Sequence, residues 1–85
     1  MAHCNLGAVL LRRERAAEAA EAYGRATRLA PGLAAAWRGL GNALARQGRP
    51  DEARAALGRA LDLDPGDPRA RQLLDSLETG GEAGR

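Results

Sequence analysis

The chain has 85 residues, a formal net charge of +2 and a single cysteine, which is enough for one small domain. Its basic residues alternate with acidic ones, whereas nucleic-acid binding favours a clustered basic face. No segment reaches the roughly 18 apolar residues of a membrane span, and Cys4 alone cannot form an intramolecular disulfide or a Cys-rich zinc site. We therefore expect a cytoplasmic protein that binds neither nucleic acid nor a membrane.

The first part of the chain predicts a pair of helices. Ala and Leu supply most of the apolar residues, and Ala favours helices that approach closely. Residues 2–13 form the first predicted helix, with Leu6 and Leu10 on one apolar stripe. A break near Glu14 leads to a second helix, which ends near Leu29 because the Pro-Gly pair that follows cannot continue it.

The next part repeats this pattern more clearly. A predicted helix over residues 34–46 carries Trp37, Leu40 and Leu44 at positions i, i+3 and i+7. A Gly-Arg-Pro break follows. Pro50 and two acidic residues then open another helix, because Pro suits the first turn and the helix dipole favours acids there. A second Pro-Gly pair closes that helix.

A fifth helix is predicted over residues 68–78. Asp67 is a good N-cap, and Pro68 suits the first helical position. Three leucines lie on one side of this helix, namely Leu73, Leu74 and Leu77. The segment aligns with the first helix of a third unit, so we interpret it as a capping helix. Residues 79–85 have nothing to bury and are predicted to be disordered.

One period relates these parts of the chain. When the sequence is shifted by 34 positions, many residues meet an identical residue. The clearest pairs are Leu6/Leu40, Gly7/Gly41, Leu10/Leu44, Ala19/Ala53, Ala26/Ala60 and Pro31/Pro65. Agreement this dense at one offset indicates a repeat architecture. It predicts two repeats, over residues 1–33 and 34–67, before the capping helix.

The landmarks from Trp37 to Pro65 resemble the tetratricopeptide repeat family, whose unit is a helix–turn–helix. The resemblance covers about residues 1–78 and implies an all-α, right-handed superhelix of helical hairpins with five helices. It also implies a protein–protein interaction module. In that family the first helix of each unit lines a concave groove, which binds a peptide or a partner segment.

Five glycines fall inside predicted helices, namely Gly7, Gly24, Gly39, Gly41 and Gly58, and each costs up to about 1 kcal/mol relative to Ala. We interpret Gly7 and Gly41 as making room for paired helices to cross closely, with Trp37 filling the space between helices. Gly24 and Gly58 occupy positions where the repeat pattern asks for no glycine. Two interpretations of Gly24 and Gly58 stay open: neutral drift, or a close contact with a neighbouring segment.

Carried over to this chain, the resemblance implies a basic groove. The candidate peptide-binding residues are Arg12, Arg38, Asn42, Arg46, Arg69 and Gln72. The other groove-facing positions would be Cys4, Ala8, Leu11, Ala45 and Ser76. Such a surface suits an acidic peptide or a C-terminal carboxylate. Some family members clamp the C-terminal carboxylate of a chaperone with Lys and Asn side chains. Only Asn42, with Arg38 in a neighbouring role, matches that pattern here.

No catalytic, metal or cofactor site is predicted, and we do not expect an enzyme. The chain has one His and one Ser, which cannot assemble a catalytic constellation. His3 and Cys4 are adjacent on a helix and point in different directions. The acidic run around Asp64 lacks the calcium-loop spacing, since Leu73 stands where the bidentate Glu should be.

Three other functions stay open at this point. The chain could be a structural or oligomerisation segment, a slice of a longer array, or an accessory segment to an enzyme domain outside it. Self-association would use the uncapped N-terminal helix. It would be isologous in a dimer and filament-forming if head-to-tail.

Overall fold

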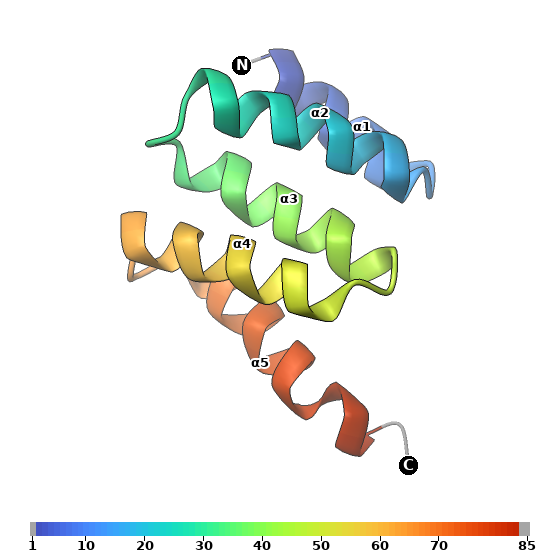
Figure 1. Ribbon diagram of the computed structural model, residues 1–85, viewed down its shortest axis with the longest axis vertical. Helices are drawn as coiled ribbons and strands as arrows, with labels where there is room; N and C mark the ends of the chain where they lie inside the picture. The colour runs from blue at the N-terminus through green and yellow to red at the C-terminus, as the bar shows by residue number, and fades with distance from the viewer. Residues whose placement is uncertain (1, 84–85) are drawn as a thin grey trace.

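The computed structural model describes the backbone of residues 2–83 and the side chains of residues 4–78. The described residues form five α-helices and no strand, which confirms the all-α prediction. The helices are α1 (Ala2–Arg12), α2 (Ala16–Leu29), α3 (Ala34–Arg46), α4 (Pro50–Leu63) and α5 (Pro68–Ala83). Figure 1 shows them stacked in chain order along the longest axis, as hairpins α1–α2 and α3–α4 followed by α5.

The turns inside the two hairpins share one geometry. Glu14 and Gly48 both adopt the left-handed backbone, with φ of 61° and 76°. Gly accepts this conformation freely, whereas a Cβ makes it costly for Glu14. In both turns the next amide donates back to a helix carbonyl, Arg15 to Leu10 at 2.8 Å and Arg49 to Leu44 at 3.0 Å.

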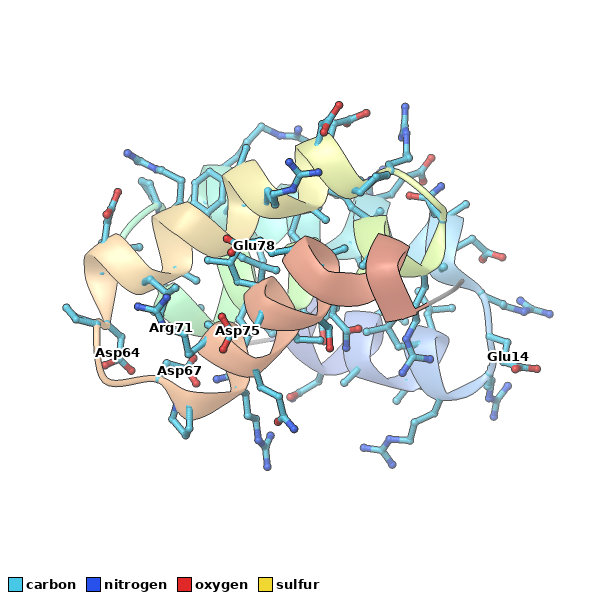
Figure 2. The ribbon with its side chains drawn as sticks, turned by 90° about the horizontal axis from the view of Figure 1, so that it is seen from below. Glu14, Asp64, Asp67, Arg71, Asp75 and Glu78 are labelled. Carbon is cyan, nitrogen blue, oxygen red and sulfur yellow. The ribbon has the colours of Figure 1, made fainter. Side chains whose placement is uncertain are left out.

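The connections between successive hairpins lie at the other end of the molecule. In Figure 2 the side chain of Glu14 lies at the opposite end from those of Asp64 and Asp67, in the loop between α4 and α5. Because every helix reverses the direction of the previous one, each packs beside its chain neighbour. This local packing is the arrangement that a repeat of short helical hairpins requires.

The buried residues form three groups along the stack. The first contains Leu11, Ala19, Tyr23 and Ala43, the second Leu44, Ala53 and Ala56, and the third Leu57, Ala60 and Ala70. Each group joins residues from successive helices, so the core is continuous from α1 to α5. Small alanines let the helices approach closely, as the composition predicted.

Trp37 packs against the second and third of these groups. Its indole Nε1 donates to the carbonyl oxygen of Pro31 at 2.9 Å. The guanidinium of Arg59 lies over the ring, 5.3 Å from its centroid, within range of a cation–π interaction. The prediction that Trp37 fills the space between helices is therefore confirmed.

Three of the five mid-helix glycines, Gly7, Gly39 and Gly41, are close to a side chain of a neighbouring helix. A Cβ built on Gly7 would lie 2.6 Å from the Tyr23 ring, and one on Gly41 would lie 2.6 Å from Cγ of Leu57. No real Cβ is that close to another heavy atom, so both glycines provide room, as predicted. Nothing lies within 4 Å of a Cβ at Gly24 or Gly58. The interpretation that Gly24 and Gly58 make room for a close neighbour is therefore wrong.

Two expectations about the ends of the chain need correction. The fifth helix does not stop at residue 78 but continues to Ala83. Once a helix is nucleated, each added residue gains a backbone hydrogen bond. Residues 84 and 85, the rest of the expected disordered tail, lie outside the described residues.

The apolar stripe of α1 is also less buried than expected. Leu10 packs against the first core group, but Leu6 is 50% exposed and Val9 is 41% exposed. Both side chains are therefore partly open to solvent. None of the helices in the described part of the chain is long and apolar enough to cross a membrane.

Candidate functional site

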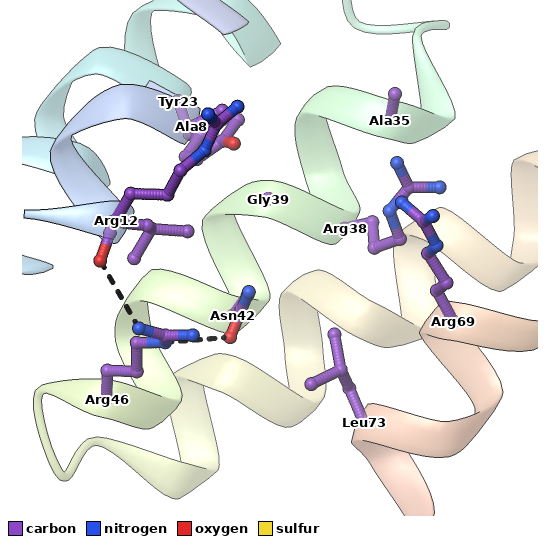
Figure 3. Close-up of a pocket in the computed structure, with 11 residues that line it drawn as sticks. Ala8, Arg12, Tyr23, Ala35, Arg38, Gly39, Asn42, Arg46, Arg69 and Leu73 are labelled. Carbon is purple, nitrogen blue, oxygen red and sulfur yellow. Dashed lines mark hydrogen bonds between the residues drawn. The ribbon is translucent and has the colours of Figure 1, made fainter. Parts of the chain in front are cut away.

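A hollow of about 320 Å³ lies between α1, α3 and α5. These are the helices that open each hairpin, together with the capping helix. The candidate residues Arg12, Arg38, Asn42, Arg46 and Arg69 all line it (Figure 3). The remaining lining residues are Ala8, Leu11, Tyr23, Ala35, Gly39 and Leu73. We call this hollow the basic groove.

Of the other predicted positions, Ala8 and Leu11 also line the basic groove, whereas Gln72, Cys4, Ala45 and Ser76 do not. Gln72 is exposed on α5, and its neighbour Leu73 faces the basic groove instead. Adjacent helical positions point in directions about 100° apart, so the two residues do not face the groove together. Cys4 and Ala45 pack against the core groups. The side chain of His3 lies outside the described residues.

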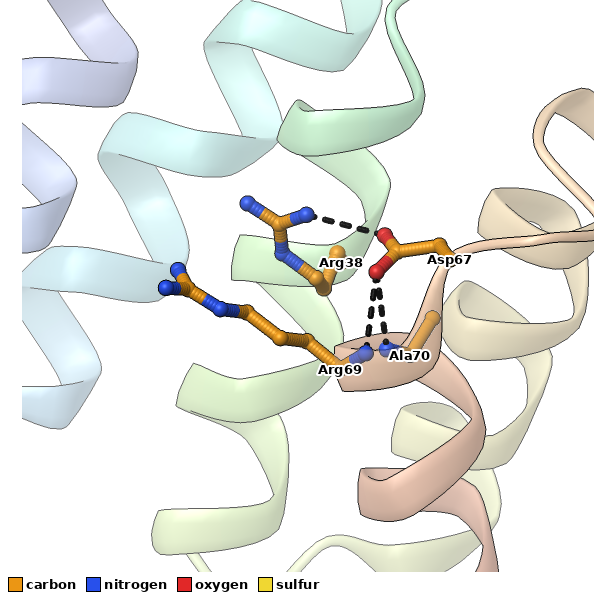
Figure 4. A network of polar contacts seen from close by, with 4 residues as sticks. All are labelled: Arg38, Asp67, Arg69 and Ala70. Atoms are coloured by element: carbon orange, nitrogen blue, oxygen red, sulfur yellow. Dashed lines mark hydrogen bonds and ion pairs between the residues drawn. The ribbon is translucent and has the colours of Figure 1, made fainter.

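Arg38 is held by an ion pair that sequence analysis did not predict. Its Nη1 donates to Oδ2 of Asp67 at 2.8 Å. The other carboxylate oxygen of Asp67 accepts the backbone amides of Arg69 at 3.0 Å and Ala70 at 3.4 Å, which caps the start of α5 (Figure 4). One carboxylate therefore both caps α5 and joins it to α3.

Asp67 is 5% exposed, and burial alone would raise the pKa of its carboxyl. The hydrogen bond and charge of Arg38, with the amides of Ala70 and Arg69, outweigh that effect and hold the pKa below its ordinary value of 3.8. Asp67 therefore stays ionised at neutral pH, and the capping residue predicted from the sequence is also an ion-pair partner.

Arg46 is likewise engaged inside the molecule. Its Nη1 donates to the carbonyl oxygen of Leu11 at 3.3 Å, and its Nε donates to Oδ1 of Asn42 at 3.4 Å (Figure 3). The carbonyl of Leu11 belongs to the last turn of α1, where the helix dipole favours a positive charge. Arg46 therefore links the first helices of the two hairpins.

Two guanidinium groups of the basic groove have no such partner. The side chains of Arg12 and Arg69 form no hydrogen bond or ion pair with any residue that the structure describes. Both residues are exposed and line the groove. Their guanidinium groups have all of their donors available to a ligand, whereas Arg38 and Arg46 already use part of theirs inside the molecule.

Four lining residues were not predicted from the sequence, namely Ala35, Gly39, Leu73 and Tyr23. Of these, only Tyr23 has a polar side chain. It comes from α2, and burial raises the pKa of its phenol, with Cys4 adding to that effect and the charges of Arg38 and Arg12 opposing it. The sequence offered one signal for Tyr23. The residue one period later, at the equivalent position of the second repeat, is the apolar Leu57. A tyrosine where the repeat holds leucine brings a hydroxyl to an otherwise apolar position.

The stacked hairpins and their shared groove define a helical repeat protein. The sequence model of the tetratricopeptide repeat family matches residues 4–68, which is most of the chain. The chain therefore belongs to the tetratricopeptide repeat family. Repeats of this family are generally protein–protein interaction modules and are typically non-catalytic. A comparison with curated proteins returned no match.

Proposed function

We propose that the chain binds an acidic peptide or partner segment in the basic groove. The observation that carries this proposal is the convergence of four arginines from α1, α3 and α5. No acidic side chain is among the lining residues of the described structure. Asp67, held against Arg38, neutralises one of the four charges, so a net positive charge faces the groove.

The unpaired arginines set the ligand chemistry. A guanidinium binds a carboxylate through two parallel N–H donors, which gives geometric specificity as well as energy. Arg12 and Arg69 lie on different helices of the groove, so one extended ligand with more than one carboxylate could contact both. A side-chain carboxylate and a C-terminal carboxylate both fit this chemistry.

A matched pair of double variants tests this proposal. Arg12 and Arg69 line the groove, whereas Arg13 and Arg71 are exposed on the same segments and do not line it. Replacing Arg12 and Arg69 by Ala should weaken binding to an array of acidic peptides by about tenfold or more. The loss should shrink as salt is added.

Replacing Arg13 and Arg71 by Ala is the control, because it removes the same charge from outside the groove. This control should bind the array nearly as the natural chain does. Equal losses in the two double variants would mean that net charge, and not the groove, governs binding. We also propose the cytoplasm as the location of the protein, in keeping with its free Cys4.

A second candidate function is self-association through the outer side of the first hairpin. A shallow hollow there is lined by Leu6, Leu10, Glu21 and Arg25, among others. Its lining combines apolar side chains with charges of both signs, so two copies related by a two-fold axis could match acid to base. If the chain is a slice of a longer array, or an accessory segment to an enzyme domain, the same side of the first hairpin would contact the adjoining repeat or domain.

A further inference from the structure

We propose that the Tyr23 hydroxyl is a specificity-determining donor at the floor of the basic groove. It would donate a hydrogen bond to a ligand carboxylate that Arg12 and Arg38 also contact. The inference rests on the proposed function, because the ligand is the same acidic peptide. It assigns a role to a residue of α2, a helix that otherwise contributes nothing to the groove lining.

The backbone on both sides of the ring aims Tyr23 at the groove. A Cβ on Gly7 of α1 would lie 2.6 to 2.8 Å from Cε2, Cδ2 and Cζ of the ring. A Cβ on Gly39 of α3 would meet the opposite edge, at Cε1, Cζ and Cδ1, at even closer range. The ring thus lies between two glycine backbones, and its hydroxyl end reaches the space between α1 and α3.

The hydroxyl is available to a ligand. It forms no hydrogen bond with any residue that the structure describes, although Tyr23 as a whole is only 7% exposed. Among the described residues, Gln47 has the one fully buried side-chain polar atom without a partner. The Tyr23 oxygen is therefore not sealed in the core. Figure 3 shows it at the same end of the groove as the Arg12 guanidinium.

The charges around the hydroxyl suit a carboxylate. Arg12 and Arg38 both act electrostatically on the phenol, and Asp67 occupies only Nη1 of Arg38. A guanidinium has five N–H donors, so Arg38 keeps donors free while it holds α5. Burial keeps the Tyr23 pKa above its ordinary value of 10.0, so the phenol is protonated at neutral pH and donates.

Core packing alone does not require the hydroxyl. At the equivalent position of the second hairpin, Leu57 is a fully buried apolar side chain, and it fills the space beside Gly41. Packing beside the glycine of the paired helix therefore requires no hydroxyl at this position of the repeat. The hydroxyl of Tyr23 adds a polar group where four arginines converge.

Tyr23→Phe tests the proposal, because it keeps the ring between Gly7 and Gly39 and removes only the oxygen. The probe is a fluorescein-labelled peptide of alternating Gly and Glu, followed by fluorescence polarisation. Tyr23→Phe should weaken binding by about tenfold, as expected for a hydrogen bond to a charged group. In an Arg12→Ala background the same change should cost less, since both groups bind one carboxylate.

Two further probes identify the carboxylate. One is the same peptide with an amidated C-terminus, and the other carries Gln in place of Glu. If Tyr23→Phe weakens only peptides that contain Glu, a side-chain carboxylate contacts the hydroxyl. If it weakens only peptides with a free C-terminus, the terminal carboxylate does so. Either result supports the role of Tyr23.

A measurement on the natural chain does not depend on whether the Tyr23→Phe variant folds. Tyr23 is the only tyrosine, so its ultraviolet absorption should change when the Gly-Glu peptide binds the natural chain. Unchanged affinity in Tyr23→Phe, together with an unchanged tyrosine spectrum, would overturn the role of Tyr23. The proposed function would then survive through Arg12 and Arg69. Failure of the natural chain to bind any probe would overturn both.

Discussion

At the scale of single residues, two kinds of helical glycine have opposite roles. A Cβ built on Gly41 would lie 2.6 Å from Cγ of Leu57 and 3.3 Å from the carbonyl oxygen of Ala53. Gly24 faces open space. The first is required by helix crossing, whereas the second only lowers helix propensity. The two positions therefore predict opposite effects for the same substitution.

Gly41→Ala should lower the free energy of unfolding by about 1 to 3 kcal/mol, because Leu57 is fully buried and cannot move away without strain. Gly24→Ala should raise it by about 0.5 to 1 kcal/mol through helix propensity and reduced entropy of the unfolded chain. Urea unfolding of both variants measures the difference. A gain in both would mean that α3 and α4 can separate at no cost.

The sequence predicted Gly7 and Gly41 as spacers because they stand one period apart in the repeat pattern. It did not predict Gly39, whose Cβ would clash with Tyr23, or Tyr23 itself as a groove residue. Those two residues are neighbours only because α2 packs across α3. A contact of this kind depends on the stacking angle, which periodicity alone does not give.

At the scale of an element, the start of α5 depends on one carboxylate with two roles. The sequence predicted Asp67 as an N-cap from local chemistry, and the structure confirms it. It did not predict the pairing with Arg38, which is 29 residues away along the chain. The capping role follows from neighbouring residues, whereas the ion pair exists only once α5 packs against α3.

Asp67→Asn separates the two roles, because Asn is also a good N-cap but carries no charge. At neutral pH it should lower the free energy of unfolding by about 1 to 2 kcal/mol through loss of the charged hydrogen bond to Arg38. The folded pKa of Asp67 lies below 3.8. Its contribution is therefore fully present above that pH and is lost as the pH falls through the folded pKa.

The difference between the natural chain and Asp67→Asn should thus disappear in acid. Urea unfolding over a pH series measures it. Asp64→Asn is the control, since Asp64 is exposed in the same loop and should change stability by less than about 0.5 kcal/mol. A constant difference across the pH series would show that the Arg38 pairing contributes nothing.

At the scale of the whole molecule, the two ends of the stack differ. The helix α5 packs against α4 at one end, whereas apolar side chains of α1 are exposed at the other. Leu6 and Val9 occupy positions whose counterparts one period later are Leu40 and Ala43. Those counterparts belong to or pack against the first core group, which includes Tyr23 of α2. The repeat therefore uses these positions for stacking, and in α1 they are exposed.

If a second copy covers this side, sedimentation velocity should show a mass that rises with protein concentration. Leu6→Glu should keep the chain monomeric throughout, because burial of a carboxylate opposes association. Leu29→Glu is the control, as Leu29 is 73% exposed at the far end of α2. A monomer at all concentrations in the natural chain would exclude self-association through α1.

The overall architecture was the most predictable level. A period of 34 residues and the Pro-Gly breaks predicted the number of helices and most of their ends, including residues 34–46 for α3. The end of α5 was wrong, because the prediction relied on side-chain burial and not on backbone propagation. The arginines of the groove were predicted from the resemblance to the tetratricopeptide repeat family, in which the first helices of successive units line one groove.

The ring of Tyr23 has a consequence for engineering the groove. It sets the distance between α1 and α3 and also carries the polar atom at the groove floor. Any redesign toward a different ligand is therefore limited at this position to flat aromatic rings of similar width. Recognition could be retuned by changing the ring substituent, while aliphatic replacements would shift the two backbones that support the arginines.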